Sequence, residues 1–416
     1  MTTTNTATTA STSLRSTIEL PLPRDVPADV RQALRRHLYW VAPQIAEVAL
    51  VERADGPCLV VDYRGPRPLA AIERDLGRAV AGILAGTTAF TAREVARHSA
   101  GPLRSAPAAD PFPDLVSRRW VLPEAPGVFG YAGLVAGLLE GLDGFLRRRL
   151  GRFRPAAVLL PSLTSPGTLL RTGALPEAAH TAHFVFHLDE SLSTTSRFAA
   201  ECIPDGADAL DLRALPGTSA APDAVLAPAA CQPFYRTLSD QVLREPVVVT
   251  GRASCYRYES GATETLRRLT EYRVRELIVV GSAAQVAAIR AELLEFTIGL
   301  LAELSLDGRL VTASDPFFVD AFARMRSYQL AMEVKHELLL SLPFDGSEVA
   351  GCSVNHHGEH FGRAWNIRTA DGNPAQSCCL GFGLERWAYA VLAQYGTDPA
   401  AWPDELRRIS DGSSAA

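Results

Sequence analysis

The sequence predicts an α+β fold in which an antiparallel β-sheet is flanked by helices and a small α+β domain comes first. Runs of β-branched residues at 247–250 and 278–280 indicate strands of the sheet. Residues 283–304 carry apolar side chains in one long helical pattern, as a helix that covers a sheet does. Before position 105, a shorter succession of strand and helix patterns forms a unit of its own.

Three regions follow from these patterns. Residues 1–16 are dominated by Thr and Ser, and we expect a disordered tail. Residues 17–105 follow a β-α-β-β-α order, with helices at 28–41 and 69–84 and a hairpin turn between two apolar runs. Prolines 107, 111 and 113 then indicate a linker, so a second, larger domain is expected at 106–416.

The larger region begins with an apolar stripe at 133–150 that predicts a helix, with three arginines in its last turn, where positive charge suits the helix dipole. A short strand at 157–160 is expected to follow and to stop at Pro161. No repeat is visible along the chain.

Composition excludes several classes of protein. Hydrophobic residues make up 47% and charged residues 21% of the 416 positions, as in ordinary globular proteins. No apolar run is long enough for a membrane span, and the N-terminus lacks a signal-peptide pattern, so we expect a cytoplasmic protein. The 7 cysteines argue for a metal or nucleophilic role rather than a disulfide framework. A net charge of −5 argues against broad nucleic-acid binding.

Two segments place polar side chains where they can bind one ligand together. Arg257 and Glu259 are two residues apart, so on an extended strand both would address the same ligand. A second strand carrying Tyr272 and Glu276 is expected to return antiparallel and to place both side chains on one face.

A glycine-rich segment follows near the end of the chain. Gly381 and Gly383 precede Glu385 and Arg386 at an expected strand-to-helix turn, where glycines allow a ligand to approach closely. An arginine at the start of that helix can bind phosphate oxygens in a forked geometry. A single Gly-x-Gly is weak by itself, but its combination with Arg257-x-Glu259 is more specific.

These segments resemble the motifs of class II aminoacyl-tRNA synthetases. Arg257-x-Glu259 is similar to motif 2, the Gly381-to-Arg386 segment to motif 3, and the helix at 133–150 to the dimer-forming motif 1. The resemblance covers residues 108–412 and implies a class II synthetase-type antiparallel sheet, ATP as co-substrate and a homodimer.

Within this class the chain is similar to the zinc-dependent, seryl-tRNA-synthetase-like amino acid:carrier protein ligases. The segments that carry this resemblance include Ala229–Cys231, Lys335–Glu337, Ser353–Gly362 and Cys378–Trp387. Class II motif 3 usually begins Gly-x-Gly-x-Gly, and here Cys379 replaces the first glycine. The zinc-containing members keep a cysteine at that position.

The resemblance implies a zinc site formed by Cys231, Glu276 and Cys379. Two thiolates, one carboxylate and an open fourth position are typical of a working zinc site, and zinc would bind the α-amine of the substrate. The neighbouring Cys378 is the main rival ligand, but alternation along a strand puts Cys379 on the face of Gly381.

The resemblance also assigns ATP contacts. Arg257 is expected at the α-phosphate and Arg386 at the γ-phosphate, and these two residues would carry catalysis. Glu259 would address the adenine amine or the amino acid, and Tyr272 would stack on adenine. Glu348 is expected to bind Mg²⁺. The serine that assists it in seryl-type enzymes is replaced here by Gly351, which leaves the second ligand open.

Two groups of histidines offer a different metal hypothesis: one is His180, His183 and His187, and the other is His356, His357 and His360. His180, His183 and His187 are spaced for one helical face, but the intervening residues favour a strand that would separate them. His356 and His360 fall within the resemblance and are expected to line the active site.

The predicted function is therefore ATP-dependent activation of a small amino acid, glycine or alanine by resemblance, and its transfer to the phosphopantetheine thiol of a carrier protein. The alternative is an atypical zinc-dependent seryl-tRNA synthetase, which also has an N-terminal α+β domain. We expect tRNA not to be the acceptor, because residues 17–105 contain no coiled-coil pattern and no basic run. A catalytically silent binding protein is disfavoured by the intact Arg257, Glu259 and Arg386.

Overall fold

The computed structural model describes residues 15–84, 92–101, 107–203, 215–260, 263, 265–314 and 328–411. The chain forms two compact units, of which the smaller comprises residues 1–93, 260–263 and 313–333. Within the described part of the chain, no helix is long and apolar enough to cross a membrane.

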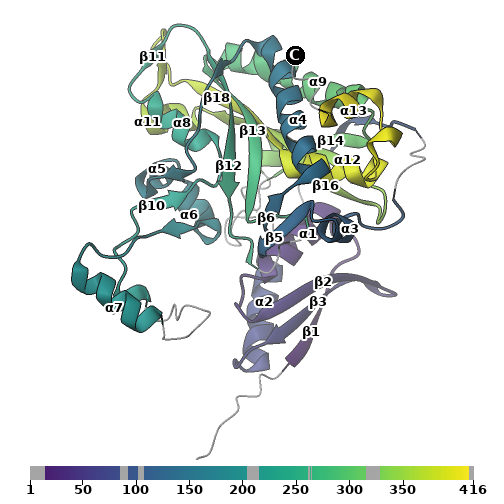
Figure 1. Cartoon of the computed structure of the whole chain (residues 1–416), viewed down its shortest axis with the longest axis vertical. Coiled ribbons are helices and arrows are strands. Elements are labelled where there is room, and N and C mark those ends of the chain that lie inside the picture. The colour runs from purple at the N-terminus through teal and green to yellow at the C-terminus, as the bar shows by residue number, and fades with distance from the viewer. Residues whose placement is uncertain are drawn as a thin grey trace, which may run out of the picture. The chain divides into compact units, whose positions relative to one another are not determined.

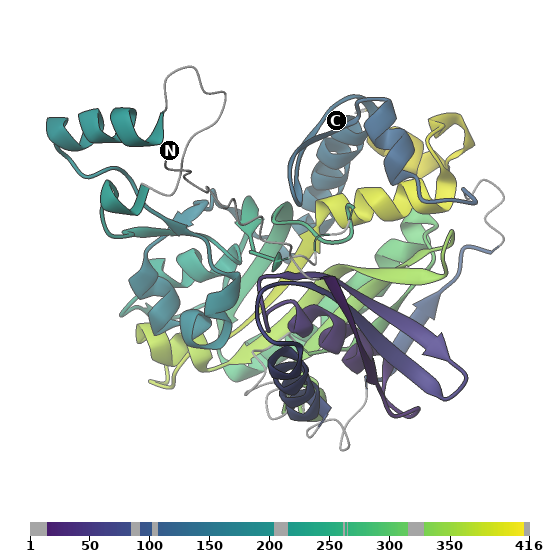
Figure 2. The same ribbon diagram turned by 90° about the horizontal axis from the view of Figure 1, so that it is seen from below.

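The smaller unit is a three-stranded antiparallel sheet with two helices packed against it (Figure 2). Its elements are β1 (Arg15–Pro21), α1 (Ala28–Leu38), β2 (Ile45–Arg53), β3 (Gly56–Arg64) and α2 (Leu69–Leu84). The predicted β-α-β-β-α order is thus present, with strand order β1-β3-β2. Most of the predicted tail lies outside the described residues, and its last two positions, Arg15 and Ser16, already pair with β3.

The larger unit contains an eight-stranded sheet in which every neighbouring pair is antiparallel except β12 and β7. This confirms the predicted antiparallel sheet flanked by helices. In spatial order the strands are β4 (Glu94–His98), β14 (Gly308–Thr312), β15 (Lys335–Leu342), β16 (Ser347–Gly358), β18 (Gln376–Gly383), β13 (Glu271–Gly281), β12 (Val247–Tyr256) and β7 (Ala156–Ala157).

Helices cover both faces of this sheet (Figure 1). On one face lie α4 (Gly133–Leu150), α9 (Ala283–Leu304), α12 (Leu384–Tyr395) and α13 (Asp404–Ser410), and on the other lie α8 (Cys231–Thr237) and α11 (His360–Trp365). The helices predicted at 133–150 and 283–304 are confirmed with these bounds. The second begins with a capping box formed by Ser282 and Gln285.

Shorter elements complete the larger unit. They are α3 (Phe112–Ser117), β5 (Val121–Ala125), β6 (Val128–Tyr131), β8 (Leu163–Thr164), α5 (Pro166–Arg171), α6 (Ala174–Ala178), β9 (Phe184–Val185), α7 (Leu192–Cys202), β10 (Ala224–Leu226), β11 (Val242–Leu243) and β17 (Arg368–Thr369). Short 3-10 helices lie at Gly151–Phe153, Ala179–Thr181, Leu215–Gly217 and Pro399–Ala401.

Two predicted boundaries differ from the structure. Residues 94–98 were assigned to the N-terminal domain, but as β4 they pair with β14 in the large sheet and belong to the larger unit. The strand predicted at 157–160 is only the two residues of β7, because beyond them Leu159 is 99% exposed and Pro161 has no N–H for a ladder.

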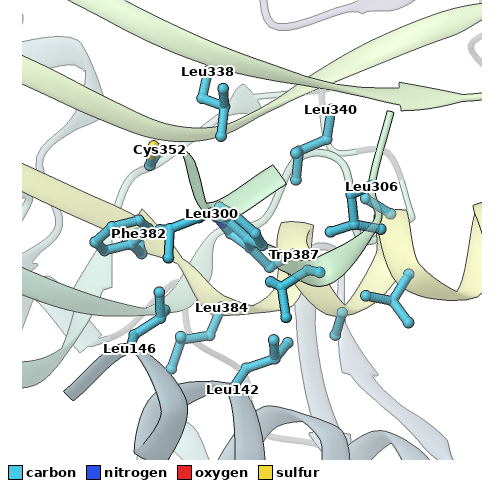
Figure 3. Close-up of a cluster of buried hydrophobic side chains, with 14 of the residues drawn as sticks. Leu142, Leu146, Leu300, Leu306, Leu338, Leu340, Cys352, Phe382, Leu384 and Trp387 are labelled. Atoms are coloured by element: carbon cyan, nitrogen blue, oxygen red, sulfur yellow. The ribbon is translucent and has the colours of Figure 1, made fainter. Parts of the chain in front are cut away.

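The main core lies between the sheet and the helices α4, α9 and α12. Figure 3 shows Leu142 and Leu146 of α4 beside Phe382 at the end of β18 and Trp387 of α12. The Trp387 indole N–H donates to the carbonyl oxygen of Gly351 at 2.9 Å. This hydrogen bond fixes α12 against β16, and with it the position of Arg386 one residue earlier.

A buried ion pair joins α4 to the same face. The Arg275 guanidinium on β13 donates from Nε and Nη2 to the two carboxylate oxygens of Asp143, at 2.7 and 2.6 Å. Arg252 of β12 binds Glu140 one turn earlier on the helix. Forked pairs of this kind fix geometry as well as charge.

We predict that replacing Asp143 with Asn lowers the free energy of unfolding by about 3 kcal/mol, because Arg275 is then left buried without its charged partner. Urea unfolding followed by circular dichroism measures this. The double variant Asp143→Leu with Arg275→Met is expected to recover most of the loss. The exposed Arg363→Met serves as the control and should change stability by less than about 0.5 kcal/mol. If the Asp143→Asn protein is as stable as that control, the Asp143–Arg275 ion pair does not stabilise the fold as predicted.

Candidate active site

The site lies on the sheet face opposite α4 and α12, and strand register determines which side chains reach it. In the β13–β18 pair, Glu276 is opposite Gly381, and in the β16–β18 pair, Asn355 is opposite Cys379. Because side chains alternate along a strand, one set of residues shares this face. We call this set the site face; it comprises Tyr272, Val274, Glu276, Ser353, Asn355, Cys379, Gly381 and Gly383.

Three metal-ligating groups meet on the site face. One ligand atom each from Cys231, Glu276 and Cys379 lies within 4.8 Å of the other two, and all three residues are buried. Cys231 comes from the first position of α8, Glu276 from β13 and Cys379 from β18. The three residues implied by the family resemblance are thus brought together.

The neighbouring cysteines point to opposite faces. Cys378 packs in the core with α4, α9 and α12, whereas Cys379 packs with Cys231 and the residues of α8 and α11. Alternation along β18 therefore excludes Cys378 from the group, as predicted from the sequence.

The electrostatics of this group favour a bound cation. Burial raises the pKa of Glu276, opposed by hydrogen bonds from Cys379 and Cys231. The hydrogen bond with Cys379, followed by burial, raises the pKa of the Cys231 thiol well above its usual range. Three acidic groups in one buried cluster cannot all ionise without a positive charge between them. Two sulfurs and a carboxylate are donors that suit Zn²⁺, and three protein ligands leave a fourth position for another molecule.

The histidine expectations need correction. His356 points away and its Nε2 contacts the Gln376 side chain at 3.2 Å, while His360 contacts the Thr172 carbonyl oxygen at 2.8 Å. It is His357 that reaches the site, with its Nε2 3.8 Å from the Cys379 sulfur. Strand alternation alone could not place His357, because the register of β16 against β18 shifts between His356 and Gly358.

Other histidines do not form a second group. Among the described residues, the triad is the one cluster of three or more His, Cys, Asp or Glu side chains with the spacing of a metal site. His183 instead packs edge-on against the Tyr258 ring. The prediction that a strand separates these histidines agrees with β9 at Phe184–Val185.

Arg257 and Tyr272 lie next to each other beyond the triad. The Arg257 guanidinium lies 5.8 Å from the centre of the Tyr272 ring, and its Nε donates to the Pro228 carbonyl oxygen at 3.0 Å. Pro228 belongs to the loop that leads into Cys231. The backbone of this loop thus connects the cationic part of the site to the metal-ligating part.

Arg257 and Glu259 lie beyond the end of β12 at Tyr256, so the predicted strand does not extend to them. The Arg257 N–H still donates to the Thr270 carbonyl oxygen, and the Tyr258 N–H donates to the Thr181 carbonyl oxygen on the other side of the chain. Glu259 accepts a hydrogen bond from Arg268 Nε at 2.7 Å. The Glu259 carboxylate is therefore paired with Arg268, in the segment before β13. It is not placed on the same face of a strand as Arg257.

Arg386 lies at the start of α12 and is partly buried. Its Nε donates to the Arg267 carbonyl oxygen at 2.9 Å and its Nη1 to the Ala350 carbonyl oxygen at 3.1 Å. Burial, followed by the nearby Arg268, lowers the pKa of Arg386. A second cation so close to the Arg386 guanidinium is an arrangement suited to an anionic ligand.

Glu348 has a protein partner. Its two carboxylate oxygens accept from Arg309 Nε and Nη2, both at 2.7 Å. Gly351 has no side chain that could be the second ligand. A serine does not fit at this position, because its Cβ would lie 2.5 Å from Leu340 and 3.0 Å from the Trp387 indole nitrogen. The residues present therefore do not form a ready magnesium site, and the role of Glu348 stays a prediction.

The two ends of the site are separated by a stretch of sheet without side chains. Gly381 and Gly383 lie on the site face between the triad and Arg386. A ligand with an amine at one end and phosphates at the other could lie along this stretch, with the amine at the triad and the phosphates at the arginines.

Comparison with known proteins agrees with this geometry. No family model matches the chain. It is 31% identical to amino acid–[acyl-carrier-protein] ligase 2 of Bradyrhizobium diazoefficiens, over 73% of this chain and 88% of that protein. The similarity to ligase 1 of the same organism is also 31%, over 72% and 90%. A type-2 serine–tRNA ligase of Methanopyrus kandleri is 33% identical over 71% of this chain, which spans 59% of that ligase's length.

Solved structures give the same relationship. The seryl-tRNA synthetase of M. kandleri, crystallised with a tRNA from A. aeolicus, aligns with a TM-score of 0.69 and 25% identity over 96% of this chain and 78% of the synthetase. The cytoplasmic serine–tRNA ligase of Naegleria fowleri shares the fold, with a TM-score of 0.58 and 13% identity over 82% of this chain and 71% of that ligase. The chain therefore belongs to the class II synthetase-like ligase family that contains the amino acid–[acyl-carrier-protein] ligases and the type-2 serine–tRNA ligases.

Proposed function

We propose that this chain activates a small amino acid with ATP and transfers the aminoacyl group to the phosphopantetheine thiol of a carrier protein. The observation that carries the proposal is the cluster of three metal-ligating side chains, Cys231, Glu276 and Cys379, on the same sheet face as the arginine-lined end of the site. The amino acid–[acyl-carrier-protein] ligases of B. diazoefficiens, of which the chain covers 88% and 90%, support the acceptor.

The first step joins the substrate carboxylate to ATP. A carboxylate oxygen attacks the α-phosphorus, an aminoacyl-adenylate forms and pyrophosphate leaves. The carboxylate is ionised at neutral pH, so no side-chain base is required. Arg257 and Arg386 would hold the phosphates in line and offset the charge that develops on them. Tyr272 would present its ring to adenine, supported by the guanidinium beside it.

Zn²⁺ held by Cys231, Glu276 and Cys379 would act as a Lewis acid that binds the neutral α-amine and so fixes the carboxylate toward the phosphates. In the second step the carrier thiolate attacks the acyl carbon, a thioester forms and AMP leaves. The residues present do not fit a magnesium ion, because Glu348 is paired with Arg309.

A second candidate is the aminoacylation of tRNA. The alignment with the M. kandleri synthetase extends over 96% of this chain, which includes most of the smaller unit. That synthetase was crystallised with tRNA, so the lack of a basic run in residues 17–105 is a weak ground for excluding RNA.

We also propose that the protein forms a homodimer, because α4 resembles the dimer-forming motif 1. Light scattering, which measures the mass of the particle in solution, would test this.

We predict that the protein catalyses exchange of labelled pyrophosphate into ATP only when a small amino acid is present. Glycine and alanine are expected to support the highest rate. Arg386→Gln should reduce the exchange rate about 100-fold, because one cationic phosphate ligand is lost. The exposed Arg408→Gln, in α13, is the matched control and should keep the full rate. No exchange with any small amino acid would contradict adenylation.

A second prediction concerns the metal. Elemental analysis should find one zinc per chain in the protein and a loss of zinc in Cys231→Ser, since one thiolate ligand is removed. Cys378→Ser changes the neighbour of a ligand on the opposite face and should retain zinc. Equal zinc content in both variants would refute the triad.

The acceptor can be determined directly. Incubation with labelled amino acid, ATP, a pantetheinylated carrier protein and total tRNA is expected to label the carrier protein in a thioester that hydroxylamine cleaves. Carrier protein without its pantetheine arm is the control and should stay unlabelled. Label on tRNA alone would replace our first candidate with the second.

A further inference from the structure

We propose that Asn355 and His357 are positioning residues that donate two N–H···S hydrogen bonds to the Cys379 thiolate and thereby set how tightly the triad holds its metal. The proposal rests on the metal site proposed above. Neither residue belongs to the triad, and both come from β16, whereas Cys379 lies on the neighbouring strand β18.

The contacts converge on one sulfur. Asn355 Nδ2 lies 3.6 Å from Cys379 Sγ, and His357 Nε2 lies 3.8 Å from the same atom. Both distances are within the range of hydrogen bonds to sulfur, whose radius exceeds that of oxygen. Asn355 is directly opposite Cys379 in the β16–β18 register. The register shifts between His356 and Gly358, and there the His357 ring nitrogens contact Ser377 and Cys379, which share one face of β18.

The partners of the second imidazole nitrogen, Nδ1, allow the proton to be on Nε2. His357 Nδ1 lies 3.2 Å from the Ser377 hydroxyl and 3.4 Å from the Tyr235 hydroxyl. A hydroxyl can donate to Nδ1, which then acts as the acceptor and leaves the proton on Nε2. That tautomer directs an N–H at the sulfur.

Aromatic packing holds the imidazole ring in place. The Phe361 ring meets His357 edge to face at 4.9 Å between centroids, and Tyr235 stacks on Phe361 at 3.9 Å. Tyr235 is fully buried and comes from α8, the helix that begins with Cys231. The helix that supplies one metal ligand therefore also orients the residue that contacts another.

His357 is not a fourth ligand in this arrangement. The ligand atoms that all lie within 4.8 Å of one another are those of Cys231, Glu276 and Cys379, and no His357 nitrogen is among them. His357 approaches the group from the Cys379 side. The fourth metal position thus stays open for the substrate amine.

Charge explains why two donors would matter. Two thiolates and one carboxylate carry three negative charges against two on Zn²⁺, so the loaded site is a buried anion. Hydrogen bonds to a thiolate spread this charge, and the loss of such a partner typically costs 10–100-fold in metal affinity. They also leave the metal more electrophilic toward the amine.

The test compares two neighbouring histidines. His357→Phe keeps the ring that packs against Phe361 but removes the N–H, whereas His356→Phe makes the same change one residue away on the opposite face. Zinc affinity is measured by competition with a chromophoric chelator, and the thiolate-to-metal charge-transfer band is recorded with Co²⁺. Melting temperatures identify variants that fail to fold.

We expect His357→Phe to weaken zinc binding at least 10-fold and to move the Co²⁺ charge-transfer band to lower energy, because the sulfur lone pair loses a donor. His357→Gln, which can place an amide N–H at the same point, should restore most of the affinity. His356→Phe should match the wild type. If His357→Phe does not fold, Asn355→Ala tests the same sulfur and should also weaken binding.

Wild-type affinity and spectrum in both His357→Phe and Asn355→Ala would overturn the inference. A change in the Co²⁺ d–d bands that indicates a lost ligand in His357→Phe would also overturn it, because His357 would then bind the metal itself. If the wild-type protein binds neither zinc nor cobalt, the proposed metal site fails instead, and the two failures are thereby distinguished.

Discussion

Strand β13 buries two oppositely charged side chains at consecutive positions, and the need to neutralise both constrains the rest of the large unit. Arg275 and Glu276 are 7% and 5% exposed. Because neighbouring residues of a strand face opposite sides, the arginine faces α4 and the glutamate faces α8. A buried charge without a partner is costly, so each face must supply one.

The two faces solve this requirement differently. Asp143 on α4 neutralises Arg275 with a forked ion pair, which completes that side within the protein. On the other side Glu276 meets two thiols, groups that are themselves acidic. Protons can satisfy this cluster, but a divalent cation satisfies it with an open position left over. The first face is therefore structural, and the second is where a ligand can be bound.

Several parts of this arrangement could be predicted from sequence because they depend on local periodicity. The helices at 133–150 and 283–304 and the choice of Cys379 over Cys378 follow from spacings of 3.6 and 2 residues. The boundary near 105 was misplaced, because β4 pairs with a strand more than 200 residues later. Such pairing leaves no local signal. His357 was missed because it lies where the strand register shifts, between His356 and Gly358, and simple alternation does not assign its face.

The partners of the predicted ATP residues were also beyond local pattern. Glu348 pairs with Arg309, which lies 39 residues away on β14, and the Arg257 side chain donates to the Pro228 carbonyl oxygen. The resemblance to the class II motifs identified Glu348 and Arg257 as candidate ATP-site residues, but it did not reveal which residues they contact. The structure adds that Pro228 links the arginine to the loop before Cys231, which would couple phosphate and amine binding.

The most direct measurement is X-ray absorption at the zinc edge, with and without an aminoacyl-sulfamoyl-adenosine analogue of glycine or alanine. The account predicts two sulfur ligands at about 2.3 Å plus one carboxylate oxygen. The fourth, light-atom ligand should change when the analogue binds. A closed shell of four protein ligands that the analogue leaves unaltered would contradict the claim that the triad binds the substrate amine.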